Sequence, residues 1–106
     1  MSLLTYHDHP GGILKRMYLE PLGMSSGALA KALGVPRSRM ERFVKEEVAV
    51  TPDTALRLGR YWGTSAEMWM NMQAAYDLAK AKEDVDVSSI EPREREPVEE
   101  REHEDA

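Results

Sequence analysis

Residues 26–44 read Ser26-Gly-Ala-Leu-Ala-Lys-Ala-Leu-Gly-Val-Pro-Arg-Ser-Arg-Met-Glu-Arg-Phe-Val44, and this stretch decides the fold. Two short helices that cross steeply need a small residue where they touch, a glycine in the turn and apolar anchors in both helices. Ala30 offers the small side chain and Gly34 the turn. The anchors are Leu29, Leu33, Val35, Met40 and Phe43. The stretch predicts a helix-turn-helix, with an ordinary helical hairpin as the alternative.

The second helix of this pair divides into an apolar arc and a polar arc. At about 100° per residue, Met40, Phe43 and Val44 fall on one side. The opposite side holds Arg37, Ser38, Glu41, Arg42 and Lys45. In a helix-turn-helix such a polar arc enters the major groove of DNA. The pattern therefore predicts a DNA-binding surface.

Arginines are the natural base readers on this arc, because a guanidinium can bond both O6 and N7 of a guanine. We predict that Arg37 and Arg42 read bases with Ser38 as a helper. Arg39 lies at the edge of the arc, where a phosphate contact is expected. As an alternative, the i, i+4, i+8 spacing of Arg37, Glu41 and Lys45 is also that of a surface salt-bridge ladder.

Three further residues complete the predicted DNA-facing set. Ser25 and Ser26 begin the first helix of the pair, where free amide N–H groups and the helix dipole favour a phosphate. Helix capping alone also explains Ser25. Lys45, at the end of the polar arc, adds a positive charge beside the groove.

The N-terminal segment predicts one more helix before the helix-turn-helix. It should begin just after Pro10 and end before Pro21 and Gly23. Its apolar face would consist of Ile13, Leu14 and Met17.

Two helices are predicted after the helix-turn-helix. The first should be capped by Thr51 and end at Gly63. The second should begin with a capping box, Thr64 with Glu67 three residues on, and continue to about Lys82. The prediction for residues 1–82 is therefore an all-α domain of five helices.

Charge is distributed unevenly along the 106 residues, whose formal net charge is -5. Residues 1–82 carry 11 Lys and Arg against 8 Asp and Glu, whereas residues 83–106 carry 3 against 11. A segment with so little apolar content and so much charge does not bury enough surface to fold. We predict an acidic tail over 83–106, disordered from 91 onward, with a short docking strand or turn at Val85–Ile90. The tail is either a solvated extension or a segment that docks on a basic partner.

Several classes of protein are excluded or disfavoured. There is no cysteine, so disulfides and thiolate chemistry are excluded. His7-Asp8-His9 has no third ligand nearby, so no metal site is expected. No Gly-rich phosphate loop or catalytic constellation is present, so we expect no enzyme, no cofactor and no small-molecule substrate. No apolar run reaches the ~18 residues of a membrane span and no signal peptide opens the chain, which predicts a cytoplasmic protein.

The last predicted helix is apolar around most of its circumference. A monomer of about 80 residues buries only one stripe of such a helix, which indicates an intermolecular contact. Candidates for a homodimer interface are Trp69, Met70, Met72 and Tyr76. The alternative is that Trp62 and the N-terminal helices cover these side chains within one chain.

Five segments together resemble the HigA family of bacterial antitoxins, a branch of the Cro and phage-repressor (lambda-repressor-like) helix-turn-helix proteins. They are His9-Pro10-Gly11-x-Ile13-Leu14, Tyr18-Leu-Glu-Pro-Leu-Gly23, Ala28-Leu-Ala-Lys-Ala-Leu-Gly-Val-Pro-Arg-Ser-Arg39, Thr51-Pro-Asp-Thr-Ala-Leu-Arg-Leu58 and Trp69-Met-Asn-Met-Gln-Ala-Ala-Tyr-Asp-Leu78. The resemblance implies a dimer that binds a palindromic operator, neutralises an mRNA-cutting toxin of the HigB type and represses the operon encoding both.

The chain also departs from the pattern of that family. Where the family usually has an Asn-Gly turn after the recognition helix, this chain has Lys45-Glu46-Glu47-Val48, which is expected to bring two acids towards the DNA backbone. Gly27 is expected to weaken the first helix of the pair. Two alternatives stay open: a stand-alone or phage-encoded regulator without a toxin, and a protein-binding module that has lost operator binding.

Overall fold

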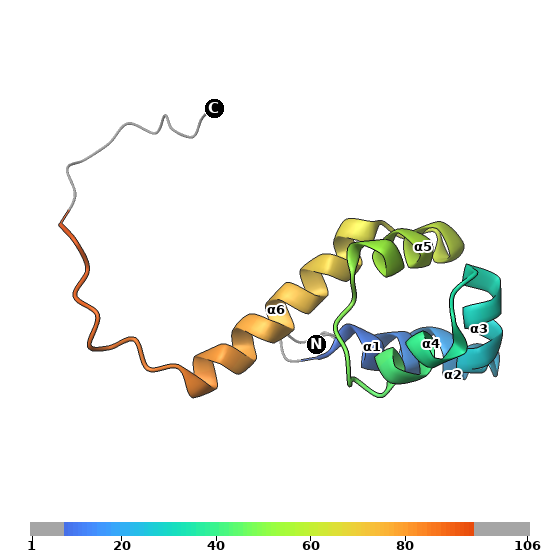
Figure 1. Cartoon of the computed structure of the whole chain (residues 1–106), viewed down its shortest axis with the longest axis horizontal. Helices are drawn as coiled ribbons and strands as arrows, with labels where there is room; N and C mark the ends of the chain where they lie inside the picture. The colour runs from blue at the N-terminus through green and yellow to red at the C-terminus, as the bar shows by residue number, and fades with distance from the viewer. Residues whose placement is uncertain (1–7, 95–106) are drawn as a thin grey trace, which may run out of the picture.

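The computed structural model describes residues 8–94, and in this range the chain is helical without a strand. The elements are α1 (Pro10–Ile13), η1 (Leu14–Leu19), α2 (Glu20–Leu22), α3 (Ser26–Leu33), α4 (Arg37–Val44), α5 (Pro52–Trp62) and α6 (Ala66–Asp84). The first three follow one another without a break, so they form one continuous N-terminal helix (Figure 1). The predicted all-α, five-helix architecture is confirmed.

The N-terminal helix contains a wide π turn. The Glu20 N–H bonds the Lys15 carbonyl five residues back, not the Arg16 carbonyl four residues back. Pro21, which follows, has no N–H and cannot bond the Met17 carbonyl. The wider turn shifts the helical phase, which leaves Met17 42% exposed and buries Leu19. The prediction that Met17 lies on the apolar face is therefore wrong, whereas Ile13 and Leu14 are buried as predicted.

The helix-turn-helix is formed by α3 and α4, as predicted. The Ser25 hydroxyl caps α3 by accepting from the Ala28 N–H at 3.0 Å. Gly34 ends the helix with φ +73°, a conformation that suits glycine. The Val35 N–H then bonds the Ala30 carbonyl at 3.0 Å, which closes the turn.

One hydrophobic core joins the helices. Phe43 and Trp69 are its largest fully buried side chains. The other members are Leu14, Leu19, Leu29, Ala30, Leu33, Met40, Val50, Ala55 and Leu58. The apolar face of α4 packs into this core, so the polar face of the same helix is directed to solvent.

The connection between α5 and α6 corrects the prediction that Thr64 caps the last helix. Thr51 caps α5 and Gly63 ends it with φ +74°, as expected. The cap of α6, however, is Ser65 and not Thr64. The Thr64 hydroxyl accepts instead from the indole N–H of Trp69 at 2.8 Å, because that buried donor needs a partner.

The end of α6 lies beyond the core. In Figure 1 its C-terminal half projects away from the other helices, and it continues to Asp84, two residues past the predicted end. Residues 87–90 form a turn, with the Ile90 N–H bonded to the Val87 carbonyl, so the turn and not the strand is present in the predicted docking segment. The predicted disorder of the tail falls mostly on residues 95–106, which lie outside the described range. No helix between residues 8 and 94 combines the length and apolar character that a membrane crossing requires.

Candidate nucleic-acid interface

The polar face of α4 presents the predicted base-reading residues to solvent. The side chains of Arg37 and Arg42 are 75% and 62% exposed, and Ser38 and Lys45 are exposed as well. On the opposite side of the helix, Met40 and Phe43 are fully buried. The surface is therefore a fixed row of polar side chains on a helix whose back is held in the core.

Both exposed arginines have acidic partners. The Nε of Arg37 donates to Glu41 at 2.7 Å, so the first rung of the alternative salt-bridge ladder exists. The Nε of Arg42 lies 3.8 Å from a carboxylate oxygen of Glu47. Each ion pair engages Nε, and within residues 8–94 the terminal nitrogens of Arg37 bond no other acceptor. An ion pair and a DNA-reading role are thus compatible at the same side chain.

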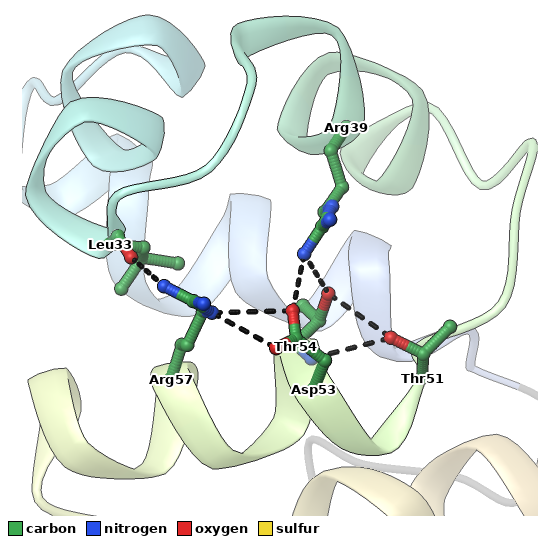
Figure 2. Close-up of polar contacts among 6 residues, drawn as sticks. All are labelled: Leu33, Arg39, Thr51, Asp53, Thr54 and Arg57. Carbon is green, nitrogen blue, oxygen red and sulfur yellow. Dashed lines mark hydrogen bonds and ion pairs between the residues drawn. The ribbon is translucent and has the colours of Figure 1, made fainter.

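Arg39 points away from the exposed row, towards α5 (Figure 2). It forms an ion pair with Asp53 and lies 3.5 Å from the Thr54 hydroxyl. The hydrogen bond from Arg39, followed by that from Arg57, lowers the pKa of the Asp53 carboxyl below its ordinary value. The phosphate contact of Arg39 remains a prediction, and in the structure this residue also links α4 to α5.

Arg57 extends the same network to α3. Its Nη1 donates to the Leu33 carbonyl at 2.8 Å, while its Nε lies 3.2 Å from both carboxylate oxygens of Asp53 (Figure 2). The Leu33 carbonyl belongs to the last turn of α3, where carbonyls lack helical partners. Asp53 and the two arginines therefore connect both helices of the helix-turn-helix to the start of α5.

The His-Pro-Gly segment holds the other end of the recognition helix. The Nδ1 of buried His9 accepts from the Gly11 N–H at 2.9 Å and so caps the N-terminal helix. A side chain at Gly11 would place its first carbon 2.7 Å from the carbonyl carbon of Phe43, and nearer still to the oxygen, so only glycine fits. The His9 ring also lies 5.8 Å from Phe43 and 4.9 Å from Tyr76, measured between ring centroids. This segment therefore packs against the C-terminal end of α4 and fixes its position, and we call it the His-Pro-Gly mount.

Burial is the main cause that lowers the pKa of His9 below 6.5. Glu46, Asp77 and the hydrogen bond with the Val48 backbone act in the opposite direction. The neutral ring is the form that can both accept at Nδ1 and donate at Nε2. Protonation of His9 would therefore release the cap at Gly11.

The two acids that follow α4 are both exposed, and their expected approach to the DNA backbone remains a prediction. Glu46 has φ +65°, a conformation usual for the glycine that the family pattern has in this turn. Its carboxylate lies over the bare backbone of Gly12, on the side of the N-terminal helix. Glu47 is the partner of Arg42. Each acid therefore has a neighbour within the chain, Gly12 for Glu46 and Arg42 for Glu47.

Gln73 is a functional support that the sequence reasoning missed. It is buried, its Oε1 accepts from the Val50 N–H at 2.8 Å, and its Nε2 donates to Asp77 at 3.0 Å. The loop between α4 and α5 is therefore fixed from α6. The signal available in the sequence was the spacing, because Gln73 follows Trp69 by four positions and so lies on the same face of the helix.

The predicted dimer residues fall into two groups. Trp69 is fully buried in its own chain, so its assignment to an intermolecular surface is wrong: the side chain fills the core and bonds Thr64. Met70, Met72 and Tyr76 are half-buried and remain candidates.

Metal binding finds no support within residues 8–94, where no three ligating side chains gather. His7 lies outside that range.

The α3–α4 pair, joined by a tight turn at Gly34 and carrying an exposed basic row on its second helix, defines a helix-turn-helix protein of the lambda-repressor-like class. No family model matches the chain. It is 55% identical over 76 residues to virulence-associated protein I of Dichelobacter nodosus, covering 72% of this chain and 70% of that protein. Among solved structures it is similar to Pseudomonas aeruginosa antitoxin HigA with the higBA promoter, at 43% identity, a TM-score of 0.71, and 73% and 84% coverage of the two chains. Another Pseudomonas aeruginosa protein, in complex with its 18-base-pair operator, matches at 40% identity and a TM-score of 0.77, over 81% and 96% of the chains. The chain belongs to the HigA family of antitoxins.

Proposed function

We propose that this chain is the antitoxin and autorepressor of a HigBA-like toxin–antitoxin module. It binds a palindromic operator as a homodimer and neutralises an mRNA-cleaving toxin of the HigB type. The observation that carries the proposal is the exposed row of Arg37, Ser38 and Arg42 on a helix whose opposite face is locked in the core. The relatives crystallised with promoter or operator DNA support this function.

DNA binding is tested with the DNA upstream of the gene in a gel shift. Arg37→Ala and Arg42→Ala should each weaken binding by about 5- to 150-fold, the worth of a lost bidentate contact with guanine. Lys80→Ala, an exposed charge on α6, is the matched control. Equal binding by the wild type and both arginine variants would contradict the proposal that Arg37 and Arg42 contact the operator.

Dimerisation through α6 is the second part of the proposal. Met70, Met72 and Tyr76 are only half-buried in one chain, so they have apolar surface left for a partner. A two-fold dimer would place the recognition helices ~34 Å apart, one turn of DNA. Sedimentation is expected to show a dimer at tens of micromolar, and a monomer there would contradict this part.

Toxin neutralisation is tested independently of DNA. Co-expression with the adjacent toxin gene should restore growth, and Arg37→Ala should retain this rescue because it changes only the DNA-facing row. We place the protein in the bacterial cytoplasm, with no catalytic activity and no cofactor, in keeping with relatives that are DNA-binding regulators.

A further inference from the structure

Arg37 has neighbours on two sides, a glycine that was expected to weaken α3 and an acid on its own helix. On one side lies Gly27, in the first turn of α3. A methyl group added there would lie 3.3 Å from Nε and 3.5 Å from Cδ of Arg37, so the arginine stem rests against bare backbone. On the other side, one turn along α4, Glu41 accepts from Nε at 2.7 Å.

These contacts restrain the side chain without covering it. The Arg37 side chain remains 75% exposed, and the Glu41 bond uses Nε, so this bond does not engage the two terminal nitrogens. A long, free arginine loses rotamer freedom when it binds, and restraint before binding reduces that loss. The terminal nitrogens are also those that can form the two parallel bonds to guanine.

We infer that Glu41 and Gly27 are positioning residues that preset Arg37 for one guanine in each half-site of the operator. This inference rests on the proposed DNA-binding function. Glu41 does not touch the base: it acts through the Arg37 guanidinium. Gly27 leaves room for the stem, which explains a glycine within an α-helix despite its cost in helix stability.

The test measures base discrimination, because overall affinity also changes when any acid near DNA is removed. Each guanine of the operator is replaced in turn by 7-deazaguanine, which lacks the N7 acceptor, and binding is measured by fluorescence anisotropy. Wild-type protein should lose several-fold in affinity at one guanine per half-site, and Arg37→Ala should lose nothing there. Glu41→Ala should bind all sites more tightly but show at least about threefold less discrimination at that guanine.

Two variants separate positioning from other effects. Glu47→Ala removes the acid paired with Arg42, so it should alter discrimination only at the guanine that Arg42 reads. Gly27→Ala should weaken discrimination at the Arg37 guanine while keeping or raising the Tm, because alanine favours the helix. A merely structural role of Gly27 would lower the Tm and leave discrimination intact.

Other outcomes overturn the inference in distinguishable ways. If Glu41→Ala distinguished guanine from 7-deazaguanine at the Arg37 guanine as strongly as the wild type does, Glu41 would not be a positioning residue. Specific operator binding with no sensitivity at any guanine would refute this inference and leave the proposed function standing, whereas absence of specific binding by the wild type would refute the proposed function.

Discussion

The contact between Gly11 and the end of the recognition helix gives a sharp test of the His-Pro-Gly mount. In Gly11→Ala the new methyl carbon would lie 2.7 Å from the Phe43 carbonyl carbon and overlap its oxygen. Ordinary contact begins near 3.4 Å, so the carbonyl carbon alone requires the two backbones to separate by about 0.7 Å, and the nearer oxygen requires more. Neither group is a flexible side-chain end, so a backbone element has to move.

The cost follows from what that movement disrupts. Overpacking a core costs about 1–3 kcal/mol, and a backbone clash beside fully buried Phe43 belongs at the upper end. Since 1 kcal/mol shifts the Tm of a domain this size by about 4–8 °C, we expect Gly11→Ala to lower the Tm by more than about 10 °C. Gly12→Ala is the matched control, because its new methyl group meets only the ends of the Glu46 and Arg16 side chains, which can move.

Urea unfolding followed by tryptophan fluorescence measures both variants. Gly12→Ala should be neutral or slightly stabilising, because alanine favours a helix by about 0.5–1 kcal/mol. Operator affinity of Gly11→Ala should also fall at temperatures where the protein remains folded, because the C-terminal end of α4 is displaced. Equal stability of the two variants would refute the claim that Gly11 mounts α4.

Three further predictions follow from single contacts. Because burial lowers the pKa of His9, the unfolded chain takes up this proton first, so the contribution of His9 to the free energy of unfolding should be flat well above pH 6.5 and fall as the pH decreases through and below 6.5. Urea titrations from pH 5 to 8 check this, and His9→Asn should remove the contribution. Asp53→Asn should lower the Tm in dilute buffer but much less in 1 M NaCl, where the Debye length of ~3 Å screens exposed ion pairs, and equal losses in both would contradict an electrostatic link. Thr64→Val should lower the free energy of unfolding in urea by about 1–3 kcal/mol, because it leaves the Trp69 N–H without its acceptor. Ser65→Ala should lower it by about 1 kcal/mol through loss of the helix cap. No change in Ser65→Ala would mean that Thr64 is the cap.

The helices could be predicted because their signals are local. Serine and threonine caps, glycines after the last turn and a periodic apolar face act within a few residues, and so Ser25, Gly34, Thr51 and Gly63 have the predicted roles. Met17 departed from its predicted place because the helix widens into a π turn over Leu14–Leu19, which changes the face on which each residue lies.

The supports of the site were harder to predict because they join distant segments. Gln73 looks like a surface residue until Val50 is brought next to it, 23 positions away in the chain. Trp69 was assigned to an intermolecular surface because the sequence of an apolar helix does not say which stripe faces its own core. The exposed row on α4 could be predicted without knowing the long-range contacts, because the amphipathic pattern of one helix places Arg37 and Arg42 on its solvent side.

The residues of the interface fall into two groups, those that hold α4 in place and those on its exposed face, and loss of each group should change DNA binding differently. His9 and Gly11 hold the end of α4 from the N-terminal helix, and Gln73 fixes the following loop from α6. Weakening this mount displaces the whole recognition helix, so it should reduce affinity for every DNA sequence by a similar factor. In our proposal Arg37 reads a base and Glu41 acts only through Arg37, so variants of these two residues should change which sequence binds best. The His-Pro-Gly segment and Gln73, from the first and last segments of the family resemblance, thus support the placement of the recognition helix, whereas we propose that the exposed face of α4 selects the operator.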